Sequence, residues 1–294
     1  MLNTSIAEPA SKLAIGTAQF GMDYGIANQN GQVAQDEVTA ILHLAWNSGI
    51  NMLDTAKVYG NSEEVIGISL ADHGESGWNI TTKVSDIQSP LSDQLRDSAE
   101  KLTVTPFTVL AHSAELFLEE KFKEELIFIR EENLVSKIGV SLYSEEEIIQ
   151  VMASELIPDI IQLPINVLDT RLYRRGNLGM LKEKGIEIYA RSAFLQGLFF
   201  LERPLLINRF PEVVPALEKL KSIASEAGLT PAELSLLWLA SLEEVDKVVL
   251  GIDNVVQLKT HLRTLEKIVD ANVFEKALCL CYENENVLNP SLWP

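Results

Sequence analysis

The sequence predicts an α/β protein whose fold is a (β/α)8 TIM barrel, a closed ring of eight parallel strands, each followed by a helix. Short runs rich in Ile, Val and Leu alternate with longer amphipathic stretches, and this alternation occurs eight times in 294 residues. Strands buried on both faces read as continuous apolar runs, and their alternation with helices implies parallel pairing through right-handed crossovers. Eight such units in this length fit a closed barrel better than an open sheet.

The eight apolar runs are the predicted strands. They lie at Leu13–Thr17, Asn51–Thr55, Asn79–Val84, Thr108–His112, Ile138–Ser141, Ile160–Leu163, Glu187–Ser192 and Val248–Gly251. No linker, low-complexity run or shift in composition interrupts the series. We therefore expect residues 1–294 to form one domain, since barrels of this class commonly reach this length as a single unit.

The stretches between the runs are the predicted helices. They lie at Gln35–Ser48, Ser62–Ala71, Leu91–Lys101, Leu116–Glu132, Ser144–Ala153, Asn177–Lys184, Pro215–Ala227 and Val255–Ile268. Ser144 followed by Glu147 predicts a capping box at one helix start. Thr230 followed by Pro231 places proline at a first helical position, which predicts an extra helix at Pro231–Ser241 within the long connection after the seventh strand.

Composition limits the classes of function. The chain carries 24 Lys and Arg against 42 Asp and Glu, a net charge of −18, so its surface repels nucleic acids and anionic membranes. No apolar stretch is long enough to span a membrane, and Met1–Ser11 lacks the pattern of a signal peptide. Cys279 and Cys281 lack the spacing of a zinc site and are expected to be reduced thiols. These features predict a cytoplasmic protein without a metal site.

Polar residues stand at the ends of successive predicted strands. Asp54, Lys83 and His112 end the second, third and fourth runs. Each alone has an ordinary explanation, as a turn cap, a solvated strand end or a hydrogen-bonded core histidine. In this fold, however, strand ends and the loops after them meet on one rim, where active sites of barrels lie. Their joint occurrence therefore favours a catalytic site, with Tyr59 on the loop after Asp54.

These residue types suit the protonation of a carbonyl oxygen. A tyrosine phenol has an ordinary pKa near 10, and a nearby ammonium such as Lys83 is expected to lower it. Asp54 would keep Lys83 charged, and His112 would orient a substrate oxygen beside the Tyr59 hydroxyl. No side chain donates a hydride, so a cofactor must supply one.

The segment Asp54-Thr55-Ala56-Lys57-Val58-Tyr59-Gly60-Asn61-Ser62-Glu63, with Lys83 and His112 after the next two strands, resembles the catalytic tetrad of the aldo-keto reductase family. The resemblance extends from Ile15 to Gly251. It implies that Asp54, Tyr59, Lys83 and His112 are catalytic, with Tyr59 as the general acid. It also implies that NADPH binds across the barrel mouth, with NADH as the alternative, and that the substrate is a small carbonyl compound.

The same resemblance implies a set of cofactor-binding residues. They are Gly16, Thr17, Asp54, Ser141, Gln162, Arg191, Ser192, Leu195, Gln196, Gly197, Gly251, Asp253, Asn254 and Gln257. Ser141 and Gln162 correspond to residues that hold the nicotinamide amide, and the segment from Tyr189 to Leu198 to the one that stacks on nicotinamide and wraps the pyrophosphate. Residues 251–258 correspond to the segment around the adenosine phosphate.

Several positions depart from the family pattern. Leu142 replaces an Asn that contacts the amide, and Arg191 stands where many relatives have an aromatic residue. Thr260 and His261 replace the Glu and Asn that meet the adenine, and Asp253 occupies a position where a basic or small residue would favour a 2′-phosphate. For Arg191 the alternatives are stacking on the cofactor ring, contact with phosphate or substrate, and a salt bridge within the barrel.

Two loops suggest further contacts. The glycine-rich segment after the first strand makes Phe20, Met22 and Tyr24 candidates for the substrate wall. The basic residues Arg171, Arg174 and Arg175, with Tyr173 between them, are predicted to meet an anionic group, either on the substrate or, more commonly, within the protein.

Three functions are compatible with these residues. The first is an NAD(P)H-dependent oxidoreductase that reduces an aldehyde or ketone. The second is a cofactor-binding barrel with a regulatory or redox-sensing role and little turnover, which would have no need of Tyr59. The third is a Schiff-base aldolase using Lys83, which pairing with Asp54 would disfavour. Neither the substrate nor the oligomeric state can be read from the sequence.

Overall fold

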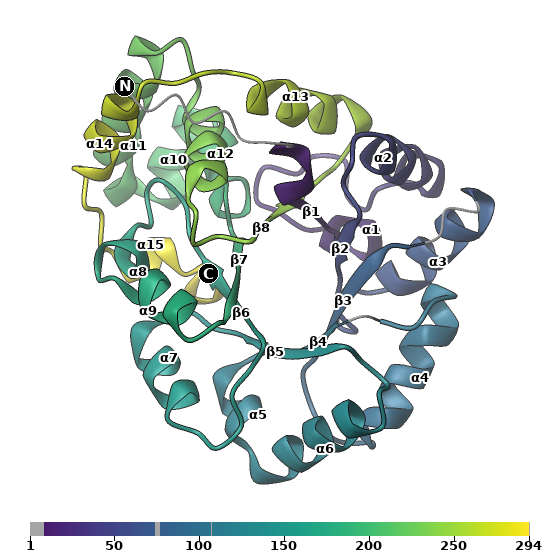
Figure 1. Ribbon diagram of the computed structural model, residues 1–294. Helices are drawn as coiled ribbons and strands as arrows, with labels where there is room; N and C mark the ends of the chain where they lie inside the picture. Colours follow the sequence, from purple (N-terminus) through teal and green to yellow (C-terminus); the bar gives the residue numbers. More distant parts are fainter. Residues whose placement is uncertain (1–8, 74–76, 107, 294) are drawn as a thin grey trace.

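In the computed structural model, which describes residues 9–73, 77–106 and 108–293, eight parallel strands close into a barrel with helices outside it (Figure 1). The strands are β1 (Leu13–Gly16), β2 (Met52–Asp54), β3 (Asn79–Val84), β4 (Thr108–Ala111), β5 (Lys137–Ser141), β6 (Ile160–Pro164), β7 (Glu187–Arg191) and β8 (Lys247–Gly251). They pair in sequence order, and β8 pairs with β1. The predicted barrel is confirmed.

The strands are buried along nearly their whole length, which explains their continuous apolar sequences. Every residue of β1, β2, β4 and β6 is buried. Each observed strand agrees with its predicted run to within one residue at either end. Thr17, Thr55, His112 and Ser192 directly follow their strands instead of ending them, which leaves them at the barrel rim.

The helices cover the outside of the ring and the loops at its mouth (Figure 1). They are α1 (Ala18–Gly21), α2 (Gln35–Asn47), α3 (Ser62–His73), α4 (Leu91–Leu102), α5 (Ala114–Leu118), α6 (Glu120–Glu131), α7 (Glu145–Met152), α8 (Arg171–Arg174), α9 (Asn177–Glu183), α10 (Arg203–Arg209), α11 (Val214–Glu226), α12 (Pro231–Ser241), α13 (Val255–Leu265), α14 (Ala271–Leu278) and α15 (Glu285–Leu288), with short 3-10 segments η1 (Pro9–Lys12), η2 (Leu195–Phe200), η3 (Pro211–Val213) and η4 (Pro290–Leu292). A capping box begins α7 at Ser144, and α12 begins with Pro231, both as predicted. Thr230 also forms a capping box at the start of α12, which was not predicted.

The predicted helix Leu116–Glu132 is two helices, α5 and α6. Glu119 has extended backbone angles (φ −67°, ψ 127°) and breaks the run between them. The first helix begins earlier than predicted because the Ser113 side chain caps it, accepting a hydrogen bond from the Leu116 N–H at 3.2 Å. The break allows the apolar faces of both helices to be buried, with Phe117 on one and Phe122 on the other fully covered.

Of the three α-helices between β7 and β8, α11 and α12 have exchanged the roles predicted for them. We expected Pro215–Ala227 to cover the barrel and Pro231–Ser241 to be the extra helix. Instead α12 is buried on nearly all sides, and its Ser235 hydroxyl donates to Ala193 O (2.8 Å) and accepts from the Val167 N–H (3.2 Å) in the loops after β7 and β6. α11 buries a single face and lies outside it.

The barrel interior has an apolar layer and a polar layer. The apolar layer includes the buried cluster Ala14, Met52, Leu110, Ile160, Tyr189 and Val249, one residue from each of six strands. Side chains two residues apart share a face of a strand, so the residues two positions further on point inward above this cluster. Together with the matching positions of β3 and β5, they are Gly16, Asp54, Lys83, His112, Ser141, Gln162, Arg191 and Gly251, which we call the strand-end layer.

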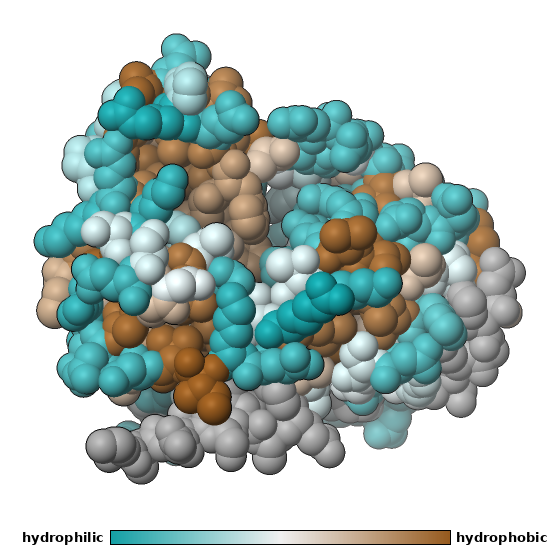
Figure 2. Space-filling model, turned by 90° about the horizontal axis from the view of Figure 1, so that it is seen from above, coloured by the Kyte–Doolittle hydropathy of each residue, from teal (hydrophilic) through white to brown (hydrophobic). Residues whose placement is uncertain are grey.

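The surface is mixed in hydropathy. On the face shown in Figure 2, hydrophobic residues form separate patches among hydrophilic ones. Cys279 and Cys281 are exposed and not disulfide-bonded. No helix within the described residues is both long and apolar enough to cross a membrane.

Candidate active site

The strand-end layer brings the predicted catalytic residues together. Asp54 ends β2, Lys83 is the penultimate residue of β3, and His112 directly follows β4. Tyr59 comes from the turn between β2 and α3. Asp54, Tyr59 and His112 line one cavity of about 340 Å³ at the barrel mouth, whereas the Lys83 side chain is 1% exposed and does not reach the cavity wall.

Both oxygens of the Asp54 carboxylate accept hydrogen bonds. Lys83 Nζ donates to Oδ1 at 2.5 Å and to the Thr55 carbonyl oxygen at 3.2 Å. Gln162 Nε2 donates to Oδ2 at 2.7 Å. The predicted ion pair is therefore present, and because both partners are buried it keeps the ammonium charge compensated. Covered and paired in this way, Lys83 is poorly placed to attack a carbonyl carbon as a Schiff-base nucleophile.

A close contact between two glycines fixes the Tyr59 turn. A Cβ atom on Gly21 would lie 1.8 Å from the Tyr59 carbonyl oxygen, and one on Gly60 would lie 2.1 Å from the Gly21 carbonyl oxygen. The turn is closed by the Tyr59 N–H, which donates to Ala56 O at 3.0 Å, and by the Ser62 N–H, which donates to Tyr59 O at 3.0 Å. The motif glycine Gly60 thus lets α1 approach closely enough to hold this turn.

The Tyr59 ring lies between a cation and an imidazole. Lys83 Nζ is 5.2 Å from the ring centroid. The Tyr59 and His112 rings meet edge to face, with centroids 6.1 Å apart. The phenol and the imidazole therefore face one small volume at the closed end of the cavity, where a carbonyl oxygen could meet both.

The expectation that Lys83 lowers the pKa of Tyr59 is wrong for this structure. Burial raises the pKa of the Tyr59 phenol above its ordinary value of 10, and the Asp54 carboxylate raises it further. The charge of Arg191 opposes both effects. Tyr59 consequently keeps its proton at neutral pH, as a proton donor must.

His112 is neutral at physiological pH. Burial lowers its pKa to about 4, and the positive charges of Lys83 and Arg191 lower it as well, against an opposing effect of Asp54. Its Nδ1 lies 3.1 Å from the Ser85 hydroxyl. If Ser85 donates in that contact, Nε2 carries the proton and can donate to a substrate oxygen.

Ser62, a polar residue of the same motif, supports the site through buried hydrogen bonds. The Ser62 hydroxyl donates to Thr17, with its oxygen 2.9 Å from both the carbonyl and the hydroxyl of that residue, and lies 3.2 Å from the Thr55 hydroxyl. Thr17 in turn donates to the Asp54 carbonyl oxygen through its N–H and its hydroxyl, both at 3.0 Å. Buried hydrogen bonds of this kind fix the strand end that carries Asp54.

Glu63 fixes the neighbouring strand. Its carboxylate is buried and accepts a hydrogen bond from the Thr82 hydroxyl at 2.7 Å. Thr82 directly precedes Lys83, so this contact ties the start of α3 to β3 beside the catalytic lysine. The Ser62-Glu63 pair of the motif is therefore structural, and neither residue lines the cavity.

Most residues predicted to bind the cofactor line the cavity. They are Gly16, Thr17, Asp54, Ser141, Gln162, Arg191, Ser192, Gln196, Gly197, Gly251, Asp253 and Gln257. Two do not. Leu195 is fully buried in the core, and the Asn254 side chain caps α13 by accepting from the Gln257 N–H at 2.8 Å. We therefore remove both side chains from the candidate binding set.

Of the three residues predicted for the substrate wall, one lines the cavity. Tyr24 does so, but Phe20 is fully buried and Met22 is exposed to solvent. Gln19 and Tyr143, which were not predicted, also line the cavity. Tyr143 follows Ser141 by two residues, so the inward alternation beyond β5 was the signal that would have identified it.

Arg191 makes no ion pair with an acidic residue in the described part of the chain, so the predicted alternative of a barrel salt bridge is wrong. Its guanidinium carbon lies 4.0 Å from the centroid of the Tyr143 ring. Nε donates to the Ser141 hydroxyl at 3.3 Å, and a terminal nitrogen donates to Leu142 O at 3.2 Å. The charge thus faces the cavity, stacked on an aromatic ring.

The segment after β7 is strained and closed by a neighbouring loop. Ser192, Leu195 and Gln196 have positive φ angles of 60°, 50° and 50°, and such non-glycine residues cluster at ligand clamps. The Ile26 N–H donates to Gln196 O at 3.0 Å, which joins the loop after β1 to this segment across the cavity.

The cavity suits a nicotinamide dinucleotide by the chemistry of its donors and acceptors. At the end near Tyr59, Ser141 offers a hydroxyl and Gln162 an amide oxygen, since its Nε2 is bound to Asp54. At the other end, the buried Asp253 Oδ1 has no hydrogen-bond partner within the described residues. An unpaired buried acceptor costs free energy unless a ligand supplies a donor.

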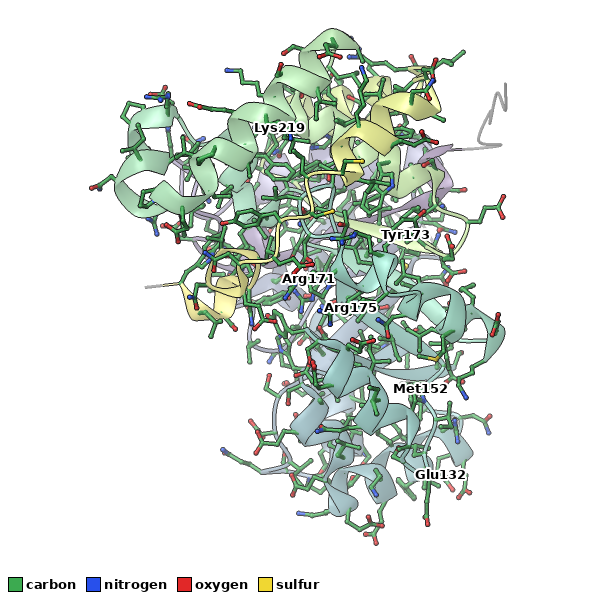
Figure 3. The ribbon with its side chains drawn as sticks, turned by 90° about the vertical axis from the view of Figure 1, so that its left-hand side faces the viewer. Glu132, Met152, Arg171, Tyr173, Arg175 and Lys219 are labelled. Carbon is green, nitrogen blue, oxygen red and sulfur yellow. The ribbon has the colours of Figure 1, made fainter. Side chains whose placement is uncertain are left out.

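The basic loop pairs with acidic residues of the protein. Arg171 binds Asp169 through Nε at 2.8 Å and Glu285 at 2.7 Å, and Arg175 binds Glu145 at 2.8 Å. Figure 3 shows Arg171 beside the yellow C-terminal segment that carries Glu285. Of the two predicted alternatives, contacts within the protein are the ones observed.

Comparison with known proteins identifies similar chains. The model of a family described as the aldo/keto reductase family matches residues 12–277. A probable voltage-gated potassium channel subunit beta from Arabidopsis thaliana is 24% identical, with 88% of this chain and 90% of that protein covered. L-galactose dehydrogenase from Arabidopsis thaliana is 23% identical, with 97% and 93% covered.

Two solved structures share the fold. The holo form of an aldo-keto reductase from Bacillus halodurans superposes with a TM-score of 0.73 at 19% identity, covering 92% of this chain and 91% of that one. The glycerol dehydrogenase from Gluconobacter oxydans superposes with a TM-score of 0.69 at 19% identity, covering 93% of both.

Proposed function

The chain belongs to the aldo/keto reductase family of oxidoreductases, and from this premise we propose that it reduces an aldehyde or ketone to an alcohol, with Tyr59 as the general acid. We also infer that the whole chain works as one barrel domain. One observation carries the proposal: the Asp54 carboxylate binds both Lys83 and Gln162, and the Tyr59 and His112 rings meet beside this buried group.

The arrangement supports proton transfer rather than nucleophilic attack. A nicotinamide cofactor, NADH or NADPH, would supply a hydride for the carbonyl carbon when bound in this cavity. The Tyr59 hydroxyl donates its proton to the carbonyl oxygen as negative charge develops there. His112, neutral and bound to Ser85, orients that oxygen. The charge of Arg191, which lowers the pKa of the Tyr59 phenol, stabilises the phenolate that remains until solvent returns a proton.

The cofactor-binding residues follow from their positions on the cavity wall. Ser141 and the Gln162 Oε1 oxygen would bind the carboxamide of the nicotinamide. The strained segment Ser192–Gly197, closed by the loop that carries Ile26, would enclose the middle of the dinucleotide. Asp253 and Gln257 would meet its other end.

A regulatory barrel with little turnover is the second candidate. The likeness to a probable potassium channel subunit beta favours it. Tyr59 and His112, aimed at one volume, favour catalysis, because cofactor binding alone needs no proton donor. The two functions are distinguished by turnover.

Cofactor affinity is first measured by titrating the protein with NADH and with NADPH and following the fluorescence of its four tryptophans. The test then compares the turnover of wild type and Tyr59→Phe on a panel of aldehydes and ketones. Loss of a well-placed general acid lowers kcat by about 10²–10⁴-fold. Cofactor affinity should be unchanged. Tyr173→Phe is the matched control, because Tyr173 packs on Trp238 outside the cavity.

Equal turnover by wild type and Tyr59→Phe would reject Tyr59 as the acid. Tight cofactor binding without turnover of any carbonyl compound would favour the regulatory function instead.

A further inference from the structure

The cavity extends between two opposite sides of the barrel. In a closed ring of eight strands in sequence order, β4 and β8 face each other, as Figure 1 shows. His112 follows β4 and Asp253 follows β8, and both line the same cavity. A cofactor that presents nicotinamide to Tyr59 and His112 therefore has to place its adenosine half toward Asp253. This step rests on the proposed function.

Asp253 has an unused acceptor at that end. Its backbone N–H donates to Gln257 Oε1 at 2.6 Å, which holds the residue against the first turn of α13. Its carboxylate oxygen Oδ1 is buried and has no partner in the described residues. Burial raises the pKa of this carboxyl, while the Gln257 side chain opposes the rise. A ligand hydroxyl would supply the missing donor.

A second carboxylate occupies the N-terminus of α13. Helix N-termini bind anions through their free N–H groups. Here Glu37, from α2, accepts the Val255 N–H at 2.7 Å, and Asn254 accepts the Gln257 N–H. Two donors that could have bound a phosphate, the Val255 and Gln257 N–H groups, are therefore already satisfied, the first of them by a negative charge that belongs to the protein.

Asp253 lines the cavity and Glu37 lies behind it at the start of α13, and within the described residues no lysine or arginine near them lines the cavity. Among the described residues that line the cavity, Arg191 is the one lysine or arginine. It ends β7 and is hydrogen-bonded to Ser141, so its charge lies in the strand-end layer and not beside Asp253. A phosphate near Asp253 and Glu37 would meet two like charges in a partly buried site, where such repulsion is poorly screened.

We propose that this protein selects NADH over NADPH, with Asp253 accepting a hydrogen bond from a ribose hydroxyl of the adenosine and Glu37 repelling a 2′-phosphate. A ribose diol offers two O–H donors to a carboxylate, whereas a 2′-phosphate replaces one donor with a dianion. Carboxylates select the unphosphorylated ribose in dinucleotide sites of other folds by this chemistry. Asp253 and Glu37 are thus specificity-determining residues.

The experiment measures binding without turnover. The full chain is titrated by calorimetry with ADP-ribose and with 2′-phospho-ADP-ribose, which differ only in the phosphate, and then with NADH and NADPH. We expect wild type to bind the unphosphorylated member of each pair at least about tenfold more tightly, an effect of the size of one lost charge interaction.

Two conservative variants locate the effect. Asp253→Asn and Glu37→Gln should each bring the ratio of the affinities for the unphosphorylated and phosphorylated ligands closer to one, and the double variant should do so further. The change should come chiefly from tighter binding of the phosphorylated ligands. The matched control is Asp36→Asn, which removes the same charge from the adjacent, exposed position of α2 and should leave the ratio unchanged. Circular dichroism confirms that each variant is folded.

The outcomes separate this inference from the proposed function. Equal or tighter binding of the phosphorylated ligands by wild type would overturn the NADH preference while leaving the reductase proposal intact. A ratio that shifts as much in Asp36→Asn as in the two variants would also overturn it, because net charge would then be the cause. If neither pair binds, the use of a nicotinamide cofactor fails, and this inference fails with it.

Discussion

At the scale of single residues, Asp54 organises the site because its two oxygens serve two different partners. One holds the Lys83 ammonium and the other the Gln162 amide, and all three side chains are buried. A buried ion pair is sensitive to the loss of one partner, since the other charge is left without compensation.

We predict that Lys83→Met lowers the free energy of unfolding by about 3–5 kcal/mol, because it leaves the Asp54 carboxylate buried and unpaired. Urea denaturation followed by circular dichroism measures the change. The double variant Asp54→Asn, Lys83→Met removes both charges and should recover part of the loss. A single variant as stable as wild type would show that Asp54 is not held as a buried charge.

Tyr59 and His112 show where reasoning from residue types was incomplete. The sequence correctly suggested a phenol beside a cation, but the sign of the effect on the phenol pKa depends on burial and on Asp54, which together raise it. Similarly, the neutral state of His112 follows from burial and from two nearby cations. The distances from these two rings to the neighbouring charges cannot be read from the local sequence.

At the scale of elements, the contact between α1 and the turn after β2 positions the proton donor. The two glycines meet backbone to backbone, so a side chain on either would push the Tyr59 turn away from the barrel axis. The Gly60 φ of 57° adds a second requirement for glycine at that position.

We predict that Gly21→Ala lowers kcat/KM for the carbonyl substrate by about 10²-fold, because misplacement of a catalytic group by about 1 Å has effects of this size. Cofactor affinity should change much less. Gly179→Ala on α9 is the control, since a Cβ there meets nothing within 4 Å. Equal kcat/KM in all three proteins would show that the α1 contact does not position Tyr59.

Element boundaries were predictable where capping residues mark them and not where packing decides. The capping box at Ser144 and the helix start at Pro231 follow from sequence alone, because the preferences that mark them are local. The break at Glu119 has no glycine or proline to announce it. Which of α11 and α12 covers the barrel was decided by Ser235 and by an all-round apolar surface, which both depend on tertiary contacts.

At the scale of the whole molecule, the acidic chain ties its mouth loops and C-terminal segment together with its few basic groups. Arg171 joins α8 to Glu285 of α15, and Arg174 reaches Glu283 at 3.5 Å. The basic loop thus has a structural role, and the cation that faces the cavity is Arg191.

Buried neutral histidines make the stability of the fold depend on pH. Burial lowers the pKa of His261 from 6.5 to about 4, and its ring stacks on Phe194 with centroids 5.0 Å apart. Between pH 6.5 and 4 the unfolded chain binds a proton that the folded state excludes. The free energy of unfolding therefore keeps its full value above pH 6.5 and decreases as the pH falls toward 4. His112 acts in the same direction, because its pKa is also lowered.

We predict that His261→Phe reduces the acid sensitivity of the fold, because phenylalanine keeps the stack on Phe194 and cannot be protonated. Between pH 7 and pH 5, the drop in Tm should be smaller in the variant than in wild type by about 2–4 °C. Thermal unfolding by circular dichroism at both values measures it. Parallel drops in the two proteins would show that His261 does not cause the acid sensitivity.

The closed barrel and the inward-facing residues at its mouth can be read from the amino-acid sequence alone. Both follow from local regularities: eight apolar runs give eight strands, and a side chain two residues after a core position points the same way. The order of strands then brings Asp54, Lys83 and His112 to one rim.

The folded structure is needed to know which groups touch and what charge they carry. It paired Asp54 with Lys83 and Gln162, placed Leu195 in the core, turned the basic loop toward acidic residues of the protein, and brought Glu37 from α2 to the start of α13. Burial and ion pairing depend on distances between segments far apart in the chain, and the periodicity of the sequence does not encode these distances.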